Sequence, residues 1–163
     1  LISLGRSPYK KFWNFDLNDE DLKNIDEAIQ IMDLNQLKDN FINELSGGQS
    51  QRAFLAMIIA QNSKILLLDE PTTFLDINYQ IKLLESLKKL LQIKKISIIT
   101  VLHDVNLAAR FCDRIAILKE GKLIDINTPK KVLNPENFKK AFEIDSHIIS
   151  TPFGLQIIPA SKI

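Results

Sequence analysis

The chain has 163 residues, of which 45% are hydrophobic and 25% charged, and this length suits one domain with or without an appendage. The ordinary apolar fraction excludes a disordered chain. Lysine and arginine total 21 against 20 acidic residues, so a net charge of +1 provides no global positive field for nucleic acid. The single cysteine excludes an internal disulfide, no apolar run approaches the roughly 20 residues of a membrane-spanning helix, and the first residues predict no secretory signal.

The first region, residues 1–45, is polar and predicts helices. Asn18 precedes the acidic turn Asp19-Glu20-Asp21, which suits the positive end of a helix dipole. The apolar residues that follow are spaced as one stripe of a helix: Leu22, Ile25, Ile29 and Met32. Aromatic residues before this helix are expected to cover part of the region: Phe12, Trp13 and Phe15.

Residues 46–127 alternate between predicted helices and strands, which indicates an α/β architecture. Helices are expected at 47–60, after Asp76 as N-cap, and at 106–111. Strands are expected at 64–68, 96–101, 114–118 and 122–126. The first two strands are apolar at both odd and even positions, which is typical of parallel strands buried on both faces. Glu120-Gly121 predicts a hairpin turn between the last two.

Residues 128–163 are expected to form an appendage. Pro129 and Pro135 each suit the first turn of a short helix, because a first-turn residue needs no amide hydrogen for the helix ladder. Residues 148–159 predict short strands on either side of Phe153-Gly154.

The first candidate site is the pentapeptide Leu45-Ser46-Gly47-Gly48-Gln49. Ser46 and Gln49 have the spacing of a capping box, so one interpretation is a helix start and nothing more. Two glycines in a first helical turn cost about 0.5–1 kcal/mol each relative to alanine, which a cap does not require. Glycine lets another group approach the backbone, and free amides at a helix N-terminus bind anions. The pentapeptide therefore predicts contact with a phosphate.

The second candidate site follows the predicted strand at 65–68, where Asp69, Glu70 and Pro71 end it. Ligands bind at the carboxyl ends of strands in open α/β sheets. Asp69 there is expected to hold Mg²⁺, and Glu70 to orient or deprotonate a water aimed at a terminal phosphate. The alternative interpretation is a strand followed by a polar turn.

His103 follows the strand at 96–101 and is expected to share a cleft with Asp69 and Glu70. A neutral imidazole there can donate a hydrogen bond to a γ-phosphate oxygen. The alternative is a structural histidine, with Asp104 capping the next helix.

A phosphate-cradling loop needs Gly-x4-Gly-Lys followed by Ser or Thr. None of the 5 glycines precedes a Lys-Ser or Lys-Thr pair. We therefore expect this chain by itself to bind nucleotide weakly.

The segments above resemble the ATP-binding-cassette (ABC) ATPase family. Residues 45–49 are similar to its signature motif, 65–70 to its Walker B strand, 74–76 to its D-loop and His103 to its switch histidine. The stretches at 4–9, 102–110 and 121–133 resemble the ATPases of iron-siderophore, haem and cobalamin importers.

The resemblance implies an α/β fold, a partial P-loop NTPase fold with a helical subdomain and the C-terminal half of a RecA-like core. Residues 1–45 correspond to part of the helical subdomain, 46–127 to the core and 128–163 to a C-terminal appendage of the same cassette. Family members carry a Walker A phosphate loop before the segments matched here. Together with Leu1 in place of a methionine, this predicts a truncated ATPase whose central sheet has an open edge and self-associates.

The resemblance also implies a mechanism with ATP and Mg²⁺ as cofactors. Two cassettes pair head to tail, with Ser46, Gly47, Gly48 and Gln49 contacting ATP held by the opposite subunit. Asp69 (the Mg²⁺ ligand), Glu70 and His103 (catalytic) act within their own subunit, and Asp76 belongs to the D-loop. Permease subunits, and through them a solute-binding protein, are the implied partners, with no nucleic acid. The implied location is cytoplasmic, peripheral on the inner face of the cell membrane.

Two other functions stay open from the sequence. One is a soluble ABC-type ATPase of DNA repair or translation, against which the compact spacing of the motifs and the neutral charge argue. The other is a non-catalytic interaction module that naturally lacks a phosphate loop.

Overall fold

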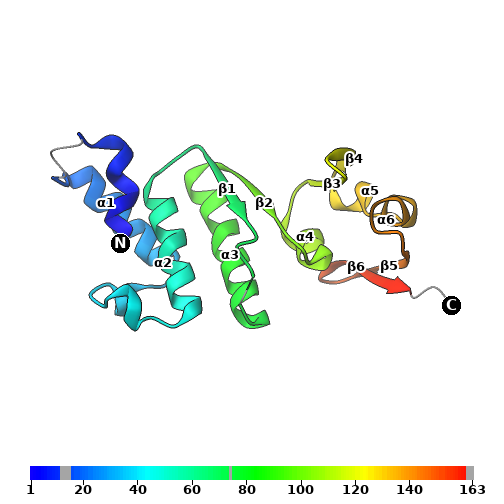
Figure 1. Cartoon of the computed structure of the whole chain (residues 1–163), viewed down its shortest axis with the longest axis horizontal. Coiled ribbons are helices and arrows are strands. Elements are labelled where there is room, and N and C mark those ends of the chain that lie inside the picture. Colours follow the sequence, from blue (N-terminus) through cyan, green and yellow to red (C-terminus); the bar gives the residue numbers. More distant parts are fainter. Residues whose placement is uncertain (12–15, 74, 161–163) are drawn as a thin grey trace. The chain divides into compact units, whose positions relative to one another are not determined.

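The computed structural model describes residues 1–11, 16–73 and 75–160, and its helices and strands are labelled in Figure 1. The chain forms two compact units, Leu1–Val101 and Leu102–Ile163. The predictions that concern Phe12, Trp13, Phe15 and Phe74 lie outside the described residues. The division of the sequence at 45 and 127 stays a prediction.

The first unit is built from helices and one pair of parallel strands (Figure 1). Its elements in chain order are η1 (Ile2–Tyr9), α1 (Asp19–Ile31), η2 (Asn35–Leu37), η3 (Ile42–Glu44), α2 (Gly47–Ala60), β1 (Ile65–Asp69), α3 (Ile77–Lys94) and β2 (Ser97–Val101). The helix expected at 47–60 and the cap expected at Asp76 are confirmed. The strands pair in register, from Ile65 with Ser97 to Asp69 with Val101.

Helix α1 begins directly after Asn18, as expected, and buries Ile29 and Met32 of the predicted apolar stripe but not its first residue. The Asn18 side chain accepts a hydrogen bond from the Asp21 amide at 2.9 Å, which confirms the N-terminus. Leu22, however, is 47% exposed, so the predicted stripe is wrong at its first position. The buried face instead includes Asp21 and Asn24. The physical reason is that Asp21 has cationic partners inside this unit.

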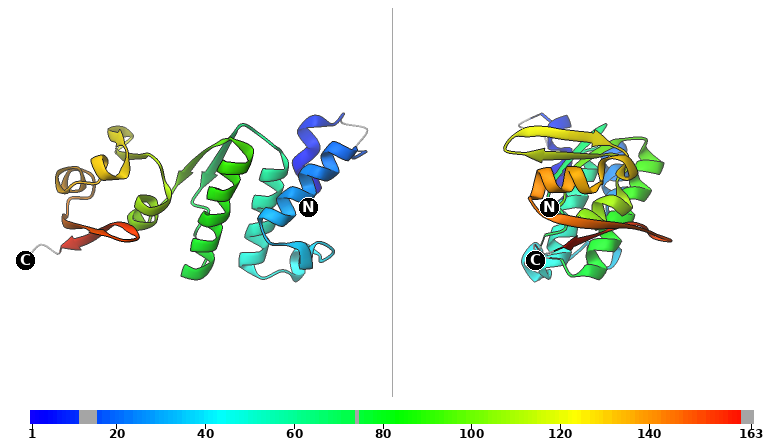
Figure 2. Two further views of the ribbon diagram at one scale, coloured as in Figure 1. Left: turned by 180° about the vertical axis from the view of Figure 1, so that it is seen from behind. Right: turned by 90° about the vertical axis from the view of Figure 1, so that its right-hand side faces the viewer.

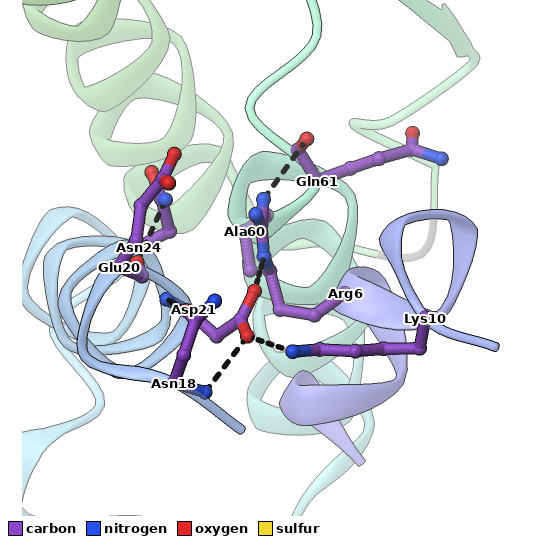
Figure 3. Close-up of polar contacts among 8 residues, drawn as sticks. All are labelled: Arg6, Lys10, Asn18, Glu20, Asp21, Asn24, Ala60 and Gln61. Carbon is purple, nitrogen blue, oxygen red and sulfur yellow. Dashed lines mark hydrogen bonds and ion pairs between the residues drawn. The ribbon is translucent and has the colours of Figure 1, made fainter. Parts of the chain in front are cut away.

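These partners, Arg6 of η1 and Lys10 directly after it, form a buried ion cluster with Asp21, shown in Figure 3. Arg6 donates from Nε to Asp21 Oδ1 at 2.8 Å, and Lys10 pairs with the other carboxylate oxygen. Arg6 also donates from Nη1 to the Ala60 carbonyl at 2.9 Å and the Gln61 carbonyl at 3.3 Å. Because a helix leaves its last carbonyls without intrahelical partners, Arg6 completes the C-terminus of α2. One guanidinium thus ties η1 to both α1 and α2.

The parallel strands are covered on one face only in this unit. Leu66 and Leu68 are buried, whereas Ile65 and Leu67 are 57% and 70% exposed. The prediction that both faces are buried is therefore wrong within the residues that the structure describes. On β2 the exposed apolar side chains are Ile99 and Val101, whose register partners on the same face of β1 are Leu67 and Asp69. We call the four apolar side chains the exposed sheet face: Ile65, Leu67, Ile99 and Val101.

The second unit begins with α4 (Val105–Phe111), which is followed by two antiparallel hairpins with two short helices between them. Its other elements are β3 (Ile115–Lys119), β4 (Lys122–Asn127), α5 (Pro129–Val132), α6 (Pro135–Phe142), β5 (Asp145–Thr151) and β6 (Gly154–Ala160). The turn expected at Glu120-Gly121 is confirmed, with both residues at positive φ (49° and 74°). Pro129 and Pro135 begin their helices as predicted.

Helix α6 lies between the β3–β4 hairpin and the β5–β6 hairpin in the right-hand view of Figure 2. The core of this unit joins Ile117 of β3, Phe138 of α6 and Ile157 of β6, with Val132 and Leu133 beside them. The C-terminal residues therefore share a core with β3. Within the described parts of both units, no helix is long and apolar enough to cross a membrane.

The buried ion cluster makes stability depend on pH through Asp21. Hydrogen bonds from Lys10, the Asn18 amide and Arg6 hold the pKa of the Asp21 carboxyl far below its usual value, although burial opposes them. The contribution of ionised Asp21 to the free energy of unfolding is fully present above the unfolded-state pKa of about 4. It is lost as the pH falls toward the lower pKa of the folded state. We expect Asp21→Asn to lower the free energy of unfolding at about pH 7, and this difference to shrink at about pH 3.

Urea unfolding of both proteins at the two pH values measures this difference. Asp26→Asn is the matched control, since Asp26 is an exposed carboxylate on the same helix. An Asp21→Asn effect that stays the same size at both pH values would contradict the assignment.

The exposed sheet face predicts self-association of this chain, since apolar side chains and an unpaired strand edge both favour pairing with a second copy. We expect Leu67→Lys to lower the average mass measured by light scattering at high protein concentration. Phe153→Lys is the control, because Phe153 is 72% exposed but belongs to the other unit. A monomeric wild-type chain would refute the prediction.

Candidate functional site

The N-terminal tip of α2 is closed by a reciprocal pair of hydrogen bonds. Gln49 accepts from the Ser46 amide through Oε1 at 2.8 Å, and Ser46 accepts from the Gln49 amide through Oγ at 3.3 Å. The Ser50 amide bonds to the Ser46 carbonyl at 2.8 Å, the first bond of the helix ladder. These bonds use the amides of Gln49 and Ser50. The amides of Gly47 and Gly48 are the first-turn groups for which a helix has no internal acceptor.

The surroundings of the two glycines differ. A Cβ built on Gly47 meets no atom within 4 Å, whereas one built on Gly48 lies 3.3 Å from Leu75 Cδ2. Gly47 is also exposed. Space within this chain therefore does not require glycine at position 47.

The tip of α2 shares a shallow pocket with the start of α3. The pocket has a volume of about 180 Å³ and is lined by Ser46, Gly48, Gln49, Leu75, Asp76 and Tyr79. Asp76 caps α3 by accepting from the Tyr79 amide at 3.0 Å. The structure thus brings together three of the four predicted residues at 46–49 and the predicted Asp76. The sequence analysis missed Tyr79, whose only signal is an aromatic residue one turn after a capping aspartate.

The two carboxylates after β1 lie at its carboxyl end, as expected. Asp69 is exposed and pairs in register with Val101. Glu70 is half-buried and has a φ of 46°, a left-handed conformation that is uncommon for residues other than glycine and turns the chain out of the strand. Thr73 donates from Oγ1 to Glu70 Oε2 at 3.2 Å and from its amide to the Glu70 carbonyl at 3.1 Å. The two neighbouring carboxylates therefore differ: Asp69 is exposed to solvent, whereas Glu70 is half-buried and accepts a hydrogen bond from Thr73.

The residues present fit a magnesium ion that takes only one or two ligands from the protein and the rest from water and phosphate. Mg²⁺ takes oxygen ligands and is usually bound by one or two carboxylates together with phosphates and water. The exposed carboxylate of Asp69 offers such a ligand. Among the described residues, no group of three or more His, Cys, Asp or Glu side chains could enclose a metal by itself.

Amide side chains from two helices hold the loop between β1 and α3. Gln51 of α2 donates from Nε2 to the Pro71 carbonyl at 2.5 Å. Gln80 of α3 donates from Nε2 to the carbonyls of Thr72 and Leu75, at 3.2 and 3.0 Å. The helix that begins at the glycine tip therefore also holds the loop that follows Asp69 and Glu70. Sequence spacing has no signal for these contacts, because they depend on where the helices pack.

His103 belongs to the second unit and is exposed. The next residue, Asp104, accepts from the amides of Asn106 at 2.8 Å and Leu107 at 3.1 Å, which confirms it as the N-cap of α4. The expectation that His103 shares a cleft with Asp69 and Glu70 stays a prediction.

Comparison with known proteins identifies relatives for almost the whole chain. The ABC transporter family matches residues 6–73. The petrobactin import ATP-binding protein FpuC of Bacillus anthracis is 44% identical over 91% of this chain and 54% of its own length. The iron(3+)-hydroxamate import ATP-binding protein FhuC of Bacillus subtilis is 40% identical over 93% of this chain and 56% of its own length.

A solved structure described as an inward-facing conformation of a metal-chelate type ABC transporter has the same fold. It superposes with a TM-score of 0.86 at 23% identity, over 98% of this chain and 65% of that one. The chain spans about half the length of the curated relatives it matches.

The contrast between the two glycines leads to a stability test. Alanine in a helix is favoured over glycine by about 0.5–1 kcal/mol, so we expect Gly47→Ala to raise the free energy of unfolding by that amount. Gly48→Ala is expected to raise the free energy of unfolding by less, because the new Cβ would lie 3.3 Å from Leu75 Cδ2 and the Leu75 side chain must shift. Urea unfolding of the two variants compares them. A loss of stability in Gly47→Ala would mean that folding itself requires glycine there.

Proposed function

Since residues 6–73 carry the ABC transporter family segment and the fold is that of part of an ABC ATPase domain, we propose that the chain contributes to the ATP-hydrolysing subunit of an importer of iron chelates. The observation that carries the proposal is the capped tip of α2. Gly48 at this tip lines one pocket with Asp76, and the same helix bonds to the loop that follows Asp69 and Glu70.

The tip of α2 suits a terminal phosphate. The amides of Gly47 and Gly48 point along the helix axis toward the N-terminus, where the helix dipole favours negative charge. The Ser46 hydroxyl accepts from Gln49, and its own hydrogen stays available to a phosphate oxygen. These groups would contact ATP bound to a second copy of the subunit, paired head to tail, so that ATP joins the two copies.

The residues after β1 suit the reacting end of the nucleotide. Asp69 would hold Mg²⁺, which, when bound, neutralises charge on the phosphate oxygens. Glu70 would orient the attacking water and take its proton. His103 would donate a hydrogen bond to a γ-phosphate oxygen, and Asp76 would complete the contact between copies at the pocket it shares with Ser46.

The chain contains no Gly-x4-Gly-Lys-Ser/Thr loop, so the complete subunit is proposed to supply this loop from another segment. By complete subunit we mean this chain joined to such a segment. Its proposed partners are permease subunits and, through them, a solute-binding protein, at the cytoplasmic face of the membrane. ATP then drives transport because it favours the closed pair of subunits over the open pair.

The iron chelate is the substrate class that the relatives favour. FpuC is named for petrobactin import and FhuC for iron(3+)-hydroxamate import. Co-purification of the complete subunit with a permease supports this function. Co-purification with DNA or ribosomes would favour a soluble ATPase instead.

Glu70→Gln in the complete subunit tests the proposed chemistry. Loss of a general base lowers the rate by about 10²–10⁴-fold, so we expect kcat for ATP hydrolysis to fall by this factor while Mg-ATP still binds. Hydrolysis and calorimetric binding are measured on the same preparations.

Glu85→Gln is the matched control, because Glu85 is an exposed glutamate on α3 outside the proposed site. Unchanged hydrolysis in Glu70→Gln would remove Glu70 from its role. A loss of Mg-ATP binding would assign Glu70 to binding rather than to proton transfer.

A further inference from the structure

We propose that Asn106 is a positioning residue for His103, and that the C-terminal β5–β6 hairpin holds the histidine-bearing turn through it. This inference rests on the proposed function of His103. It assigns a role in catalysis to a part of the chain that the sequence presents only as an appendage.

The contact between Asn106 and β6 is a pair of hydrogen bonds to one residue. The Ile157 amide donates to Asn106 Oδ1 at 2.7 Å, and Asn106 Nδ2 donates to the Ile157 carbonyl at 3.3 Å. Both peptide groups of Ile157 therefore point away from β5 and toward α4. The side-chain amide of Asn106 bonds to this amide and this carbonyl as the backbone of a neighbouring strand would. The pair therefore fixes the position and the orientation of the Asn106 backbone relative to β6.

Apolar packing supports the same contact. Ile157 is 3% exposed and belongs to the core of the second unit, against which Val105 and Ala109 of α4 also pack. Because Ile157 is buried, removal of its polar partner leaves an amide and a carbonyl without replacement by bulk water. The pair thus specifies one docking position for α4 on β6.

This docking reaches His103 through a single turn of the chain. The backbone amide of Asn106 donates to the capping Asp104, while the Asn106 side chain bonds to Ile157 of β6. The Ala108 amide bonds to the Asp104 carbonyl at 3.0 Å and closes the first turn. His103 is the residue immediately before this cap. A shift of Asn106 relative to β6 consequently moves the backbone that carries the imidazole.

The decisive experiment is a double-mutant cycle in the complete subunit, with Asn106→Ala and His103→Ala alone and together. We expect Asn106→Ala to lower kcat by about 10–100-fold, the effect of a displaced catalytic group, and to leave KM for Mg-ATP unchanged. In the His103→Ala background the same substitution is expected to have no further effect. An equal loss in both backgrounds would overturn the proposal, because it would show a general structural effect.

Asn137→Ala is the matched control. The Asn137 amide also donates within the second unit, to the Val132 carbonyl and to Asp125 Oδ2, both at 2.9 Å. Asn137→Ala removes two side-chain hydrogen bonds, as Asn106→Ala does, but neither of them involves α4. We therefore expect kcat to stay at the wild-type value.

Two measurements separate this proposal from the proposed function. Hydrogen exchange at the Ile157 amide is expected to accelerate in Asn106→Ala, and the ring signals of His103 in NMR spectra are expected to move, with neither change in Asn137→Ala. If His103→Ala leaves hydrolysis unchanged, the proposed function of His103 fails while these signals still report whether Asn106 positions it. Unchanged exchange and unchanged His103 signals in Asn106→Ala would overturn the positioning role.

Discussion

The side chains of Ser46 and Gln49 close the first turn of α2, and this reciprocal cap determines which backbone groups remain for a ligand. Once the Gln49 amide is used, the first-turn amides without an internal acceptor belong to Gly47 and Gly48, and a Cβ built on Gly47 would meet no atom within 4 Å. The cap also fixes Ser46 beside Asp76 in one pocket. The proposed contact with a phosphate therefore depends on a local hydrogen-bond pattern that any helix can form and on two glycines that few helices need.

Helix α2 connects this tip to the rest of the first unit at two further points. Its middle holds the loop after β1, through Gln51 and the Pro71 carbonyl. Its end is completed by Arg6, which also pairs with the buried Asp21 of α1. Because each of these contacts uses a polar group that would otherwise be buried without a partner, the helix has little freedom to change its position. The tip of α2 and the loop after the two carboxylates of β1 are thereby linked by one helix.

The second unit follows the same principle with a different element. Asp104 caps α4 and Asn106 docks it on β6, so the backbone after His103 is defined from both sides. In each unit a side-chain amide holds backbone close to a catalytic candidate: Gln51 bonds to the Pro71 carbonyl next to Glu70, and Asn106 bonds to Ile157 three residues after His103. Asparagine and glutamine suit this role because one group supplies both a donor and an acceptor without a charge to bury.

The sequence by itself determined the local features. The helix starts after Asn18, Ser46, Asp76 and Asp104 and the hairpin at Glu120-Gly121 were all predictable, because each depends on residues within one turn of each other. Tertiary structure decided which faces are buried. Asp21 replaced Leu22 on the inner face of α1 because Arg6 and Lys10 lie there, and one face of β1 and β2 stayed exposed in the unit that contains them. It also decided that Tyr79 joins the pocket and that Asn106 meets Ile157, a residue 51 positions away, since spacing along the chain has no information about such partners.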